Sequence, residues 1–84
     1  MHYVYVLKSN KDRKTYVGCT RDLRKRIIMH NTGRVESTAG RRPLKLIFYE
    51  AFNNQSDAFE REKYLKTGWG RNQLKKLLFN SLKI

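Results

Sequence analysis

The stretch that decides the fold is a pair of apolar runs, Tyr3-Val4-Tyr5-Val6-Leu7 and Lys14-Thr15-Tyr16-Val17-Gly18-Cys19, separated by the polar residues 9–13. Both runs are rich in β-branched and aromatic residues, and two such runs joined by a short polar interval predict a β-hairpin. Strand side chains alternate between two faces, so with Tyr5 opposite Tyr16 one face carries Tyr3, Tyr5, Leu7, Tyr16 and Gly18. The other carries Val4, Val6, Val17 and Cys19, and we expect it to face the core.

Helical periodicity begins after the hairpin. Thr20 is suited to N-cap a helix over about 21–31, in which Leu23, Ile27 and His30 form one stripe with Arg26 on its flank. Gly33 suits the end of this helix because it has no Cβ. Residues 32–42 show no periodicity and predict a basic loop.

The second half predicts one strand and two helices. Pro43 precedes a run over 44–52 that alternates as a strand does. Ser56 is suited to N-cap a helix over 57–66, and leucines at helical spacing predict another over 71–82. The predicted order is β-β-α-β-α-α, an α+β fold in which helices flank a three-stranded sheet. At this length, residues 1–84 are expected to form a single domain.

The charge balance points to a polyanionic partner. Nineteen Lys and Arg residues stand against seven Asp and Glu residues, which gives a net charge of +12. Nucleic acid, with DNA placed first, is the expected partner. No apolar run approaches the length of a membrane span, and a single cysteine favours a reducing interior. We therefore expect a cytoplasmic protein that does not engage a membrane.

Glu62 departs from the pattern of its helix. Ala58, Phe59 and Leu65 define the apolar face of the predicted helix, and Glu62 lies near the centre of that face. A buried carboxylate needs a cation, so Glu62 is expected either to pair with Arg26 or a nearby lysine, or to bind a metal.

Several polar residues allow both a structural and a chemical interpretation. Tyr5 and Tyr16 form a cross-strand aromatic pair, yet a phenol near guanidinium groups ionises more easily and could activate or order water. Gly18 allows close approach by a ligand phosphate or serves packing. Arg26 and His30 lie one helical turn apart and could bind one phosphate, or they are a solvated arginine and a histidine at the edge of the core.

Other basic and amide residues are predicted to contact the nucleic-acid backbone. They are Arg24, Lys25, Arg41 and Arg42 in the first half, and Asn72 beside Arg71 and Lys75 in the second. Known nucleotide-binding and nucleophile motifs are absent, and the carboxylates are too scattered for a two-metal centre.

Together, these elements resemble the GIY-YIG nuclease domain, especially its small stand-alone bacterial members similar to the nuclease domain of the DNA-repair excinuclease. The resemblance is carried by Tyr3-Val4-Tyr5, Tyr16-Val17-Gly18, Arg26, His30 and Arg61-Glu62-Lys63, in that order along nearly the whole chain. It implies an endonuclease that uses one divalent ion, Mg²⁺ or Mn²⁺.

The resemblance also implies a role for each residue. Tyr5 would act on the attacking water as a base or position it, Tyr16 would hold water or phosphate, and Gly18 would close the second motif. Arg26 would bind the scissile phosphate, His30 would assist Tyr5, and Glu62 would hold the metal. Asn72 is the nearest candidate for an asparagine that the family often carries.

Two departures from the motifs and two other functions remain open. Valines replace the isoleucines of the motifs, and Tyr3 replaces a glycine, which adds an aromatic ring near the expected site. One alternative is a catalytically silent DNA- or RNA-binding module. The other is a partner-binding protein that uses the leucine face of the last helix, although the core requires that face.

Overall fold

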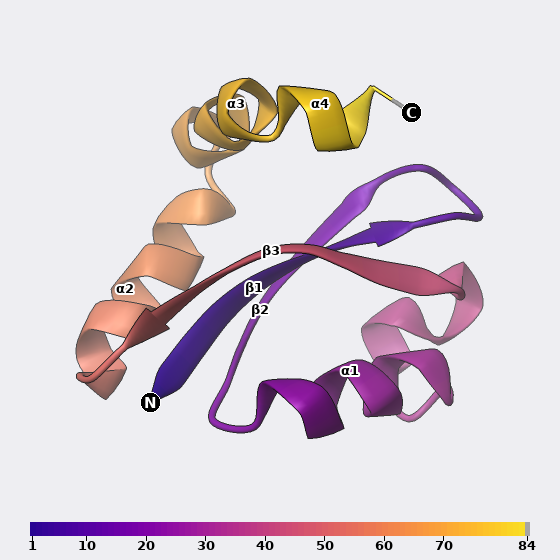
Figure 1. Cartoon of the computed structure of the whole chain (residues 1–84), viewed down its shortest axis with the longest axis horizontal. Coiled ribbons are helices and arrows are strands. Elements are labelled where there is room, and N and C mark those ends of the chain that lie inside the picture. The colour runs from indigo at the N-terminus through magenta and orange to yellow at the C-terminus, as the bar shows by residue number, and fades with distance from the viewer. Residues whose placement is uncertain (84) are drawn as a thin grey trace.

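The computed structural model describes residues 1–83. Its elements are β1 (His2–Ser9), β2 (Thr15–Thr20), α1 (Leu23–Asn31), the 3-10 helix η1 (Glu36–Arg41), β3 (Leu44–Phe52), α2 (Gln55–Leu65), α3 (Gly68–Leu77) and α4 (Phe79–Leu82). The strands form one antiparallel sheet in the order β2-β1-β3. In Figure 1, α1 and η1 lie below the sheet, and α2, α3 and α4 lie at its left and above it. The predicted α+β class with a three-stranded sheet is confirmed.

The hairpin register is shifted by two residues from the predicted one. Tyr5 pairs with Gly18, and Leu7 pairs with Tyr16, so the two tyrosines are diagonal neighbours and not directly opposite. Side chains alternate with a period of two, so a shift by an even number keeps every residue on its predicted face. The chemistry-bearing face of the hairpin is therefore the predicted one.

Both faces of the sheet are buried, although only the valine face was expected to be. On that face, a cluster is formed by Val4, Val6, Val17, Ala58, Leu65, Leu74 and Leu78. On the other face, Tyr5, Leu7 and Leu44 are buried against Leu23 and Ile27 of α1. Because helices lie on both sides, β1 is buried along most of its length.

Several helix boundaries differ from the prediction because a neighbouring residue provides the cap. The Asp22 carboxylate accepts from the amide of Lys25 and caps α1 in place of Thr20. The Asn54 side chain caps α2 in place of Ser56. The predicted basic loop contains η1. The predicted last helix begins at Gly68 and is interrupted at Leu78, which separates α3 from α4.

Gly70 fixes how α3 meets α2. A Cβ at this position would collide with the carbonyl oxygen of Tyr64 and with Cα of Leu65, both backbone atoms that cannot move aside. Any side chain at position 70 would therefore separate the two helices. The start of α3 lies directly against the end of α2 as a result.

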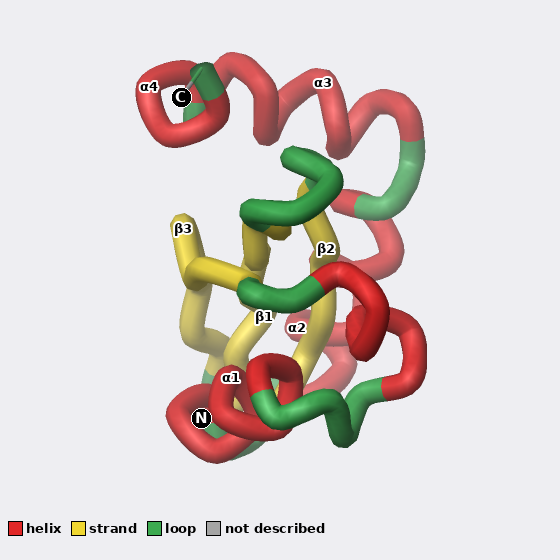
Figure 2. The backbone as a smooth tube through the Cα atoms, turned by 90° about the vertical axis from the view of Figure 1, so that its right-hand side faces the viewer, coloured by secondary structure: helices red, strands yellow, loops and turns green. Residues whose placement is uncertain are grey.

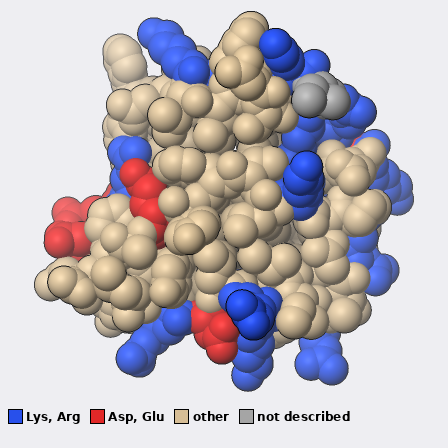
Figure 3. Space-filling model, in the orientation of Figure 1, with Lys and Arg blue, Asp and Glu red and all other residues tan. Residues whose placement is uncertain are grey.

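Basic side chains are spread widely over the surface. Figure 3 shows Lys and Arg along the upper, right and lower borders of one face, whereas Asp and Glu lie mainly at its left. Within residues 1–83, no helix has both the length and the apolar character needed to cross a membrane.

Candidate active site

A buried hydrogen bond joins β1 to α1 at the centre of the candidate site. The Tyr5 hydroxyl lies 2.7 Å from Nε2 of His30, and both residues are fully buried. Tyr5 comes from the middle of β1 and His30 from the last turn of α1. The rings of Tyr16 and His30 also meet edge to face, with centroids 5.1 Å apart. The structure therefore brings together three residues that the sequence singled out.

Thr38 on η1 completes a chain of hydrogen bonds that the sequence did not indicate. Its hydroxyl lies 2.7 Å from Nδ1 of His30 and donates to the carbonyl of Val35 at 3.5 Å. Because that hydroxyl donates to Val35, it accepts from Nδ1–H of His30, and the Tyr5 hydroxyl then donates to Nε2. This arrangement satisfies every group in the chain with a neutral imidazole, and the Tyr5 oxygen, which also accepts from the Arg26 guanidinium, keeps one lone pair for a further donor.

Burial is the main influence on the protonation of the His30 imidazole and the Tyr5 hydroxyl. It lowers the pKa of His30 to about 4, and the positive charge of Arg26 acts in the same direction. Burial also raises the pKa of the Tyr5 hydroxyl above its ordinary value, although the Arg26 guanidinium acts against this. The chemical interpretation of the tyrosine pair was a phenol that ionises more easily, and for Tyr5 that interpretation is wrong because desolvation outweighs the nearby positive charge.

Arg26 has an unsatisfied donor at this place. Its Nε is buried and has no hydrogen-bond partner among residues 1–83. A buried guanidinium N–H without a partner is unfavourable, and an anion with oxygen acceptors would satisfy it. Arg26 lies close enough to influence both Tyr5 and His30. This arginine is therefore suited to bind a phosphate beside the tyrosine.

Gly18 serves the packing of Tyr5. A Cβ on Gly18 would collide with the hydroxyl and Cζ of Tyr5, whose ring lies over β2 at this point. The close approach that the glycine permits is thus made by a side chain of the protein. The tilted rings of Tyr5 and Tyr16, with centroids 6.4 Å apart, lie on the same face.

Glu62 approaches the site from α2, which packs on the other face of the sheet. Its side chain is 23% exposed and forms an ion pair of 3.0 Å with Nζ of Lys66, one turn later on α2. Its negative charge adds to the effect of burial in raising the pKa of Tyr5 and also that of Cys19 on β2. Glu62 therefore lies near the β2 edge, where Tyr5 overlies Gly18. Of its predicted apolar neighbours, Ala58 and Leu65 are buried, whereas Phe59 is 52% exposed and does not belong to the core.

The predicted nucleic-acid contacts do not form one group. Arg24 lines a surface pocket between α1 and β3, while Lys25 is exposed on α1. Arg42 is exposed and donates from Nε to the carbonyl of Ala39. Asn72 is exposed on α3. They lie on α1, directly after η1 and on α3, and so belong to separate parts of the surface.

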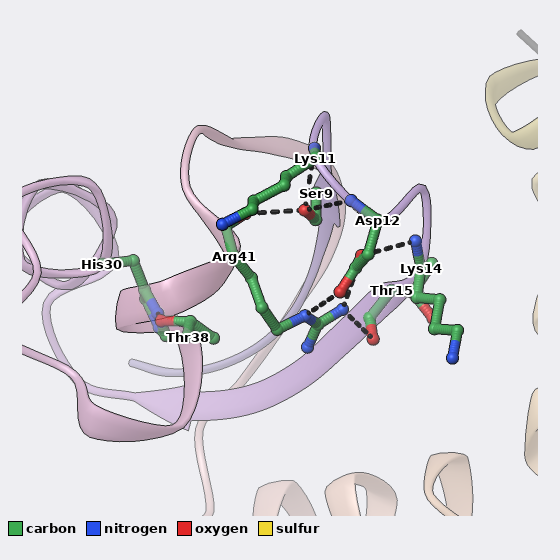
Figure 4. Close-up of polar contacts among 8 residues, drawn as sticks. All are labelled: Ser9, Lys11, Asp12, Lys14, Thr15, His30, Thr38 and Arg41. Atoms are coloured by element: carbon green, nitrogen blue, oxygen red, sulfur yellow. Dashed lines mark hydrogen bonds and ion pairs between the residues drawn. The ribbon is translucent and has the colours of Figure 1, made fainter.

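Arg41 has a structural role that its charge did not reveal. Nε donates to Oδ2 of Asp12 at 2.6 Å, and Nη2 donates to the carbonyl of Thr15 at 3.3 Å. The buried Ser9 hydroxyl donates to the Arg41 carbonyl at 2.6 Å and accepts from the amides of Lys11 and Asp12. Figure 4 shows these contacts between the hairpin turn and the segment that carries Thr38. They fasten η1 to the hairpin and thereby hold Thr38 against His30.

Tyr3 does not occupy the space beside Gly18. Its ring meets that of Tyr49 on β3 edge to face, with centroids 5.9 Å apart. Since β3 and β2 lie on opposite sides of β1, the ring of Tyr3 extends away from the β2 edge. The aromatic residue at the motif's glycine position therefore does not cover the Tyr5 hydroxyl.

The donor set near Tyr5 fits a hard cation with a single protein ligand. Within residues 1–83, no group of three His, Cys, Asp or Glu side chains is placed to hold a metal. A single carboxylate is nevertheless compatible with Mg²⁺, which usually keeps several waters and binds one or two carboxylates together with substrate phosphates. Glu62 could provide that carboxylate if the ion displaces Lys66.

Comparisons with known proteins identify the family of the chain. UPF0213 protein CPE1444 of Clostridium perfringens is 42% identical over 99% of this chain and 89% of its own length. UPF0213 protein YazA of Bacillus subtilis is 44% identical over 77% of this chain and 66% of its own length. The solution NMR structure of UPF0213 protein BH0048 from Bacillus halodurans is 34% identical, covers 90% of this chain and 83% of that one, and has a TM-score of 0.57. The GIY-YIG catalytic domain family matches residues 1–75, and the chain belongs to that family.

Proposed function

We propose that this protein is a metal-dependent endonuclease, with residues 1–84 forming one nuclease domain that hydrolyses phosphodiester bonds of DNA in the cytoplasm. The observation that carries the proposal is the buried Tyr5–His30–Thr38 chain beside Arg26, whose buried Nε has no partner among residues 1–83. A hydroxyl held in place next to an unsatisfied guanidinium is suited to align water against a phosphate. The family and the net charge of +12 agree with a nucleic-acid substrate.

In this proposal, each residue has a separate task. Arg26 binds the scissile phosphate, and its fixed charge meets the negative charge that develops on the phosphoryl oxygens. Tyr5 donates to His30 and accepts a hydrogen bond from the attacking water, which fixes the direction of attack. The raised pKa of Tyr5 favours this positioning role over that of a base. Tyr16 packs against His30 and borders the space for water and phosphate.

The metal would be held by Glu62. A bound Mg²⁺ or Mn²⁺ would lower the pKa of its water and offset charge on the phosphoryl oxygens. Lys66 would then release the carboxylate, because a partly exposed i,i+4 pair of this kind is worth about 0.3–0.5 kcal/mol.

The Glu62–Lys66 pair also favours a second candidate function. A carboxylate that already has a cation partner needs no metal, and a protein of this kind could bind nucleic acid without cleaving it. The basic surface would be retained in that case. Cleavage under divalent ions distinguishes the two candidates.

The decisive experiment compares Glu62→Gln with Glu60→Gln on branched and plasmid DNA in the presence of Mg²⁺ or Mn²⁺. Glu60 is exposed on the same helix and provides a matched loss of charge. We expect Glu62→Gln to lower the cleavage rate at least about 100-fold and Glu60→Gln to leave it unchanged. DNA binding and the circular dichroism spectrum should be retained in both variants. Binding without cleavage by the wild-type protein under either ion would favour the silent module.

Tyr5→Phe tests the positioning role, and Tyr3→Phe is its matched control. We expect Tyr5→Phe to lower the rate constant about 100-fold, because the hydroxyl that aligns the water is lost. Tyr3→Phe removes a hydroxyl from the β3 side of the face and should have no effect. Equal rates for the two variants would contradict a role for the Tyr5 hydroxyl.

A further inference from the structure

A single tryptophan stands out on the surface because it is largely uncovered. Trp69 is 81% exposed, more than any other large hydrophobic residue that is exposed in residues 1–83. It is the second residue of α3, two positions after the Thr67 N-cap. Its position is held firmly because Gly70, the next residue, packs against the backbone of α2. An exposed indole on a rigid turn is a flat surface available for stacking.

Trp69 borders a basic hollow. A pocket of about 520 Å³ is lined by Gly68, Trp69, Arg71, Asn72 and Lys75. This volume lies within the range of pockets that accommodate small ligands. Arg71 and Lys75 lie one turn apart on α3, so both charges project from the same side of the helix.

The same two cations also line the next hollow, which leads to the hairpin. That hollow, of about 460 Å³, is bordered by Arg71 and Lys75 on α3 and by Arg13, Lys14 and Thr15 at the hairpin turn and the start of β2. Its other lining residues are apolar: Val6, Leu74, Leu78 and Leu82. Trp69 therefore lies at one end of a continuous basic track, defined as Trp69, Arg71, Asn72, Lys75, Arg13 and Lys14. No Asp or Glu is among the described residues that line either hollow.

The track begins beside the β2 edge of the sheet, although α3 itself packs on the face opposite Tyr5. In Figure 2, α3 begins at the right, on the side where β2 forms the sheet edge, and runs left toward α4. Gly18 lies on β2, and Glu62 lies on α2 one turn before its end.

We propose that this track binds an unpaired segment of the nucleic-acid substrate, with one base stacked on Trp69 and the flanking phosphates on Arg71, Lys75 and the hairpin cations. The inference rests on the proposed function for its substrate class and extends it to unpaired strands. Aromatic platforms beside a positive groove bind single strands in this way, because every base has a face that can stack. Duplex bases are already stacked on one another and cannot use the indole.

The experiment uses the intrinsic fluorescence of the full-length protein, because Trp69 is its only tryptophan. A single-stranded DNA oligonucleotide, a same-sequence RNA and the matching DNA duplex are titrated without divalent ions, so that no cleavage occurs. We expect one or both single strands to quench the emission, which also identifies the preferred sugar. Unchanged emission with bound single strand, or equal quenching by the duplex, would overturn the inference.

Variants test the same track by anisotropy of a labelled single strand. Trp69→Ala should weaken binding roughly 5- to 150-fold, and Trp69→Phe should retain most of the affinity. Phe79→Ala is the matched control, since Phe79 is 63% exposed on α4, at the other end of this layer. Arg71→Ala combined with Lys75→Ala should reduce the slope of log affinity against log salt by about 1.4. Unchanged affinity in Trp69→Ala would overturn the inference.

Cleavage measurements separate this inference from the proposed function. If single strands quench Trp69 but no divalent ion supports cleavage, the track stands and the nuclease activity fails. If DNA is cleaved but Trp69→Ala binds and cleaves a single-stranded segment as the wild type does, the activity stands and the track fails. Circular dichroism of each variant verifies that it is folded.

Discussion

The two faces of the sheet are covered in different ways although the same strand supplies both. Val4 and Val6 of β1 enter an apolar cluster with α2 and α3. Tyr5, between them, enters a layer under α1 in which a phenol, an imidazole and a threonine hydroxyl are buried together. Burial of apolar surface stabilises the first face, whereas the second buries polar groups that are tolerable only while they are paired. The comparison suggests that one face supplies stability and the other supplies chemistry.

The largest expected effect comes from Leu65→Ala on the apolar face. Leu65 is fully buried, and its truncation should lower the free energy of unfolding by about 2–5 kcal/mol, measured by urea denaturation followed by circular dichroism. Activity per folded molecule should be unchanged, because Leu65 belongs to the apolar cluster on the face opposite Tyr5. A loss of the rate constant in the folded fraction would contradict the division between the faces.

The pH dependence of stability tests the other face. The pKa of His30 is lowered from 6.5 to about 4 in the folded protein. Between these values the unfolded chain binds a proton that the folded one does not, so acid favours unfolding. The His30 contribution is fully present above pH 6.5 and falls by about 1.4 kcal/mol per unit as the pH decreases toward 4.

The variant His30→Gln isolates this contribution. The slope of its free energy of unfolding against pH should be smaller across the same window, by the equivalent of up to one bound proton. The variant should also be less stable overall. Urea denaturation of both proteins between the two pKa values provides the comparison. Identical slopes would mean that His30 is not buried as a neutral group.

Thr38→Val probes the buried chain with little change of shape. The Nδ1–H of His30 loses its acceptor, which should lower the free energy of unfolding by about 1–3 kcal/mol. If Thr38 positions Tyr5 through His30, kcat should also fall, by at most about 100-fold, with KM unchanged. Thr38→Ser restores the hydroxyl and should restore kcat. A stability loss without any change in kcat would assign Thr38 a purely structural role.

The sequence predicted the features that depend on local periodicity. Alternation in β1 and β2 placed Tyr5, Tyr16 and Gly18 on one face, and helical spacing placed Glu62 inward. The caps were less predictable, because Asn54 and Ser56 are both good cap residues two positions apart. In each case the signal lies within a few residues of the feature that it predicts.

Features that depend on contacts distant in the sequence were not predictable. Thr38 lies in a segment without periodicity, and its contact with His30 is supported by Ser9 and Asp12, which hold Arg41 against the hairpin. The chemical interpretation of Tyr5 gave its pKa shift the wrong sign, since nearby arginines are visible in a sequence and desolvation is not. Buried polar residues in irregular segments with several basic neighbours are the positions where such contacts are worth seeking.

The smallest expected effect concerns Lys66, the C-cap residue of α2, which forms an ion pair with Glu62. Lys66→Met removes the cation that pairs with Glu62 and should lower the half-saturating Mg²⁺ concentration for cleavage about twofold, since an exposed helical pair is worth about 0.4 kcal/mol. Lys63→Met removes the same charge from the same helix without breaking the pair, and should shift it less. A large shift in Lys66→Met alone would mean that the pair is stronger than its exposure suggests and holds the carboxylate away from the ion. No difference between the variants would mean that Glu62 does not bind the ion. Its carboxylate would then have only a structural role.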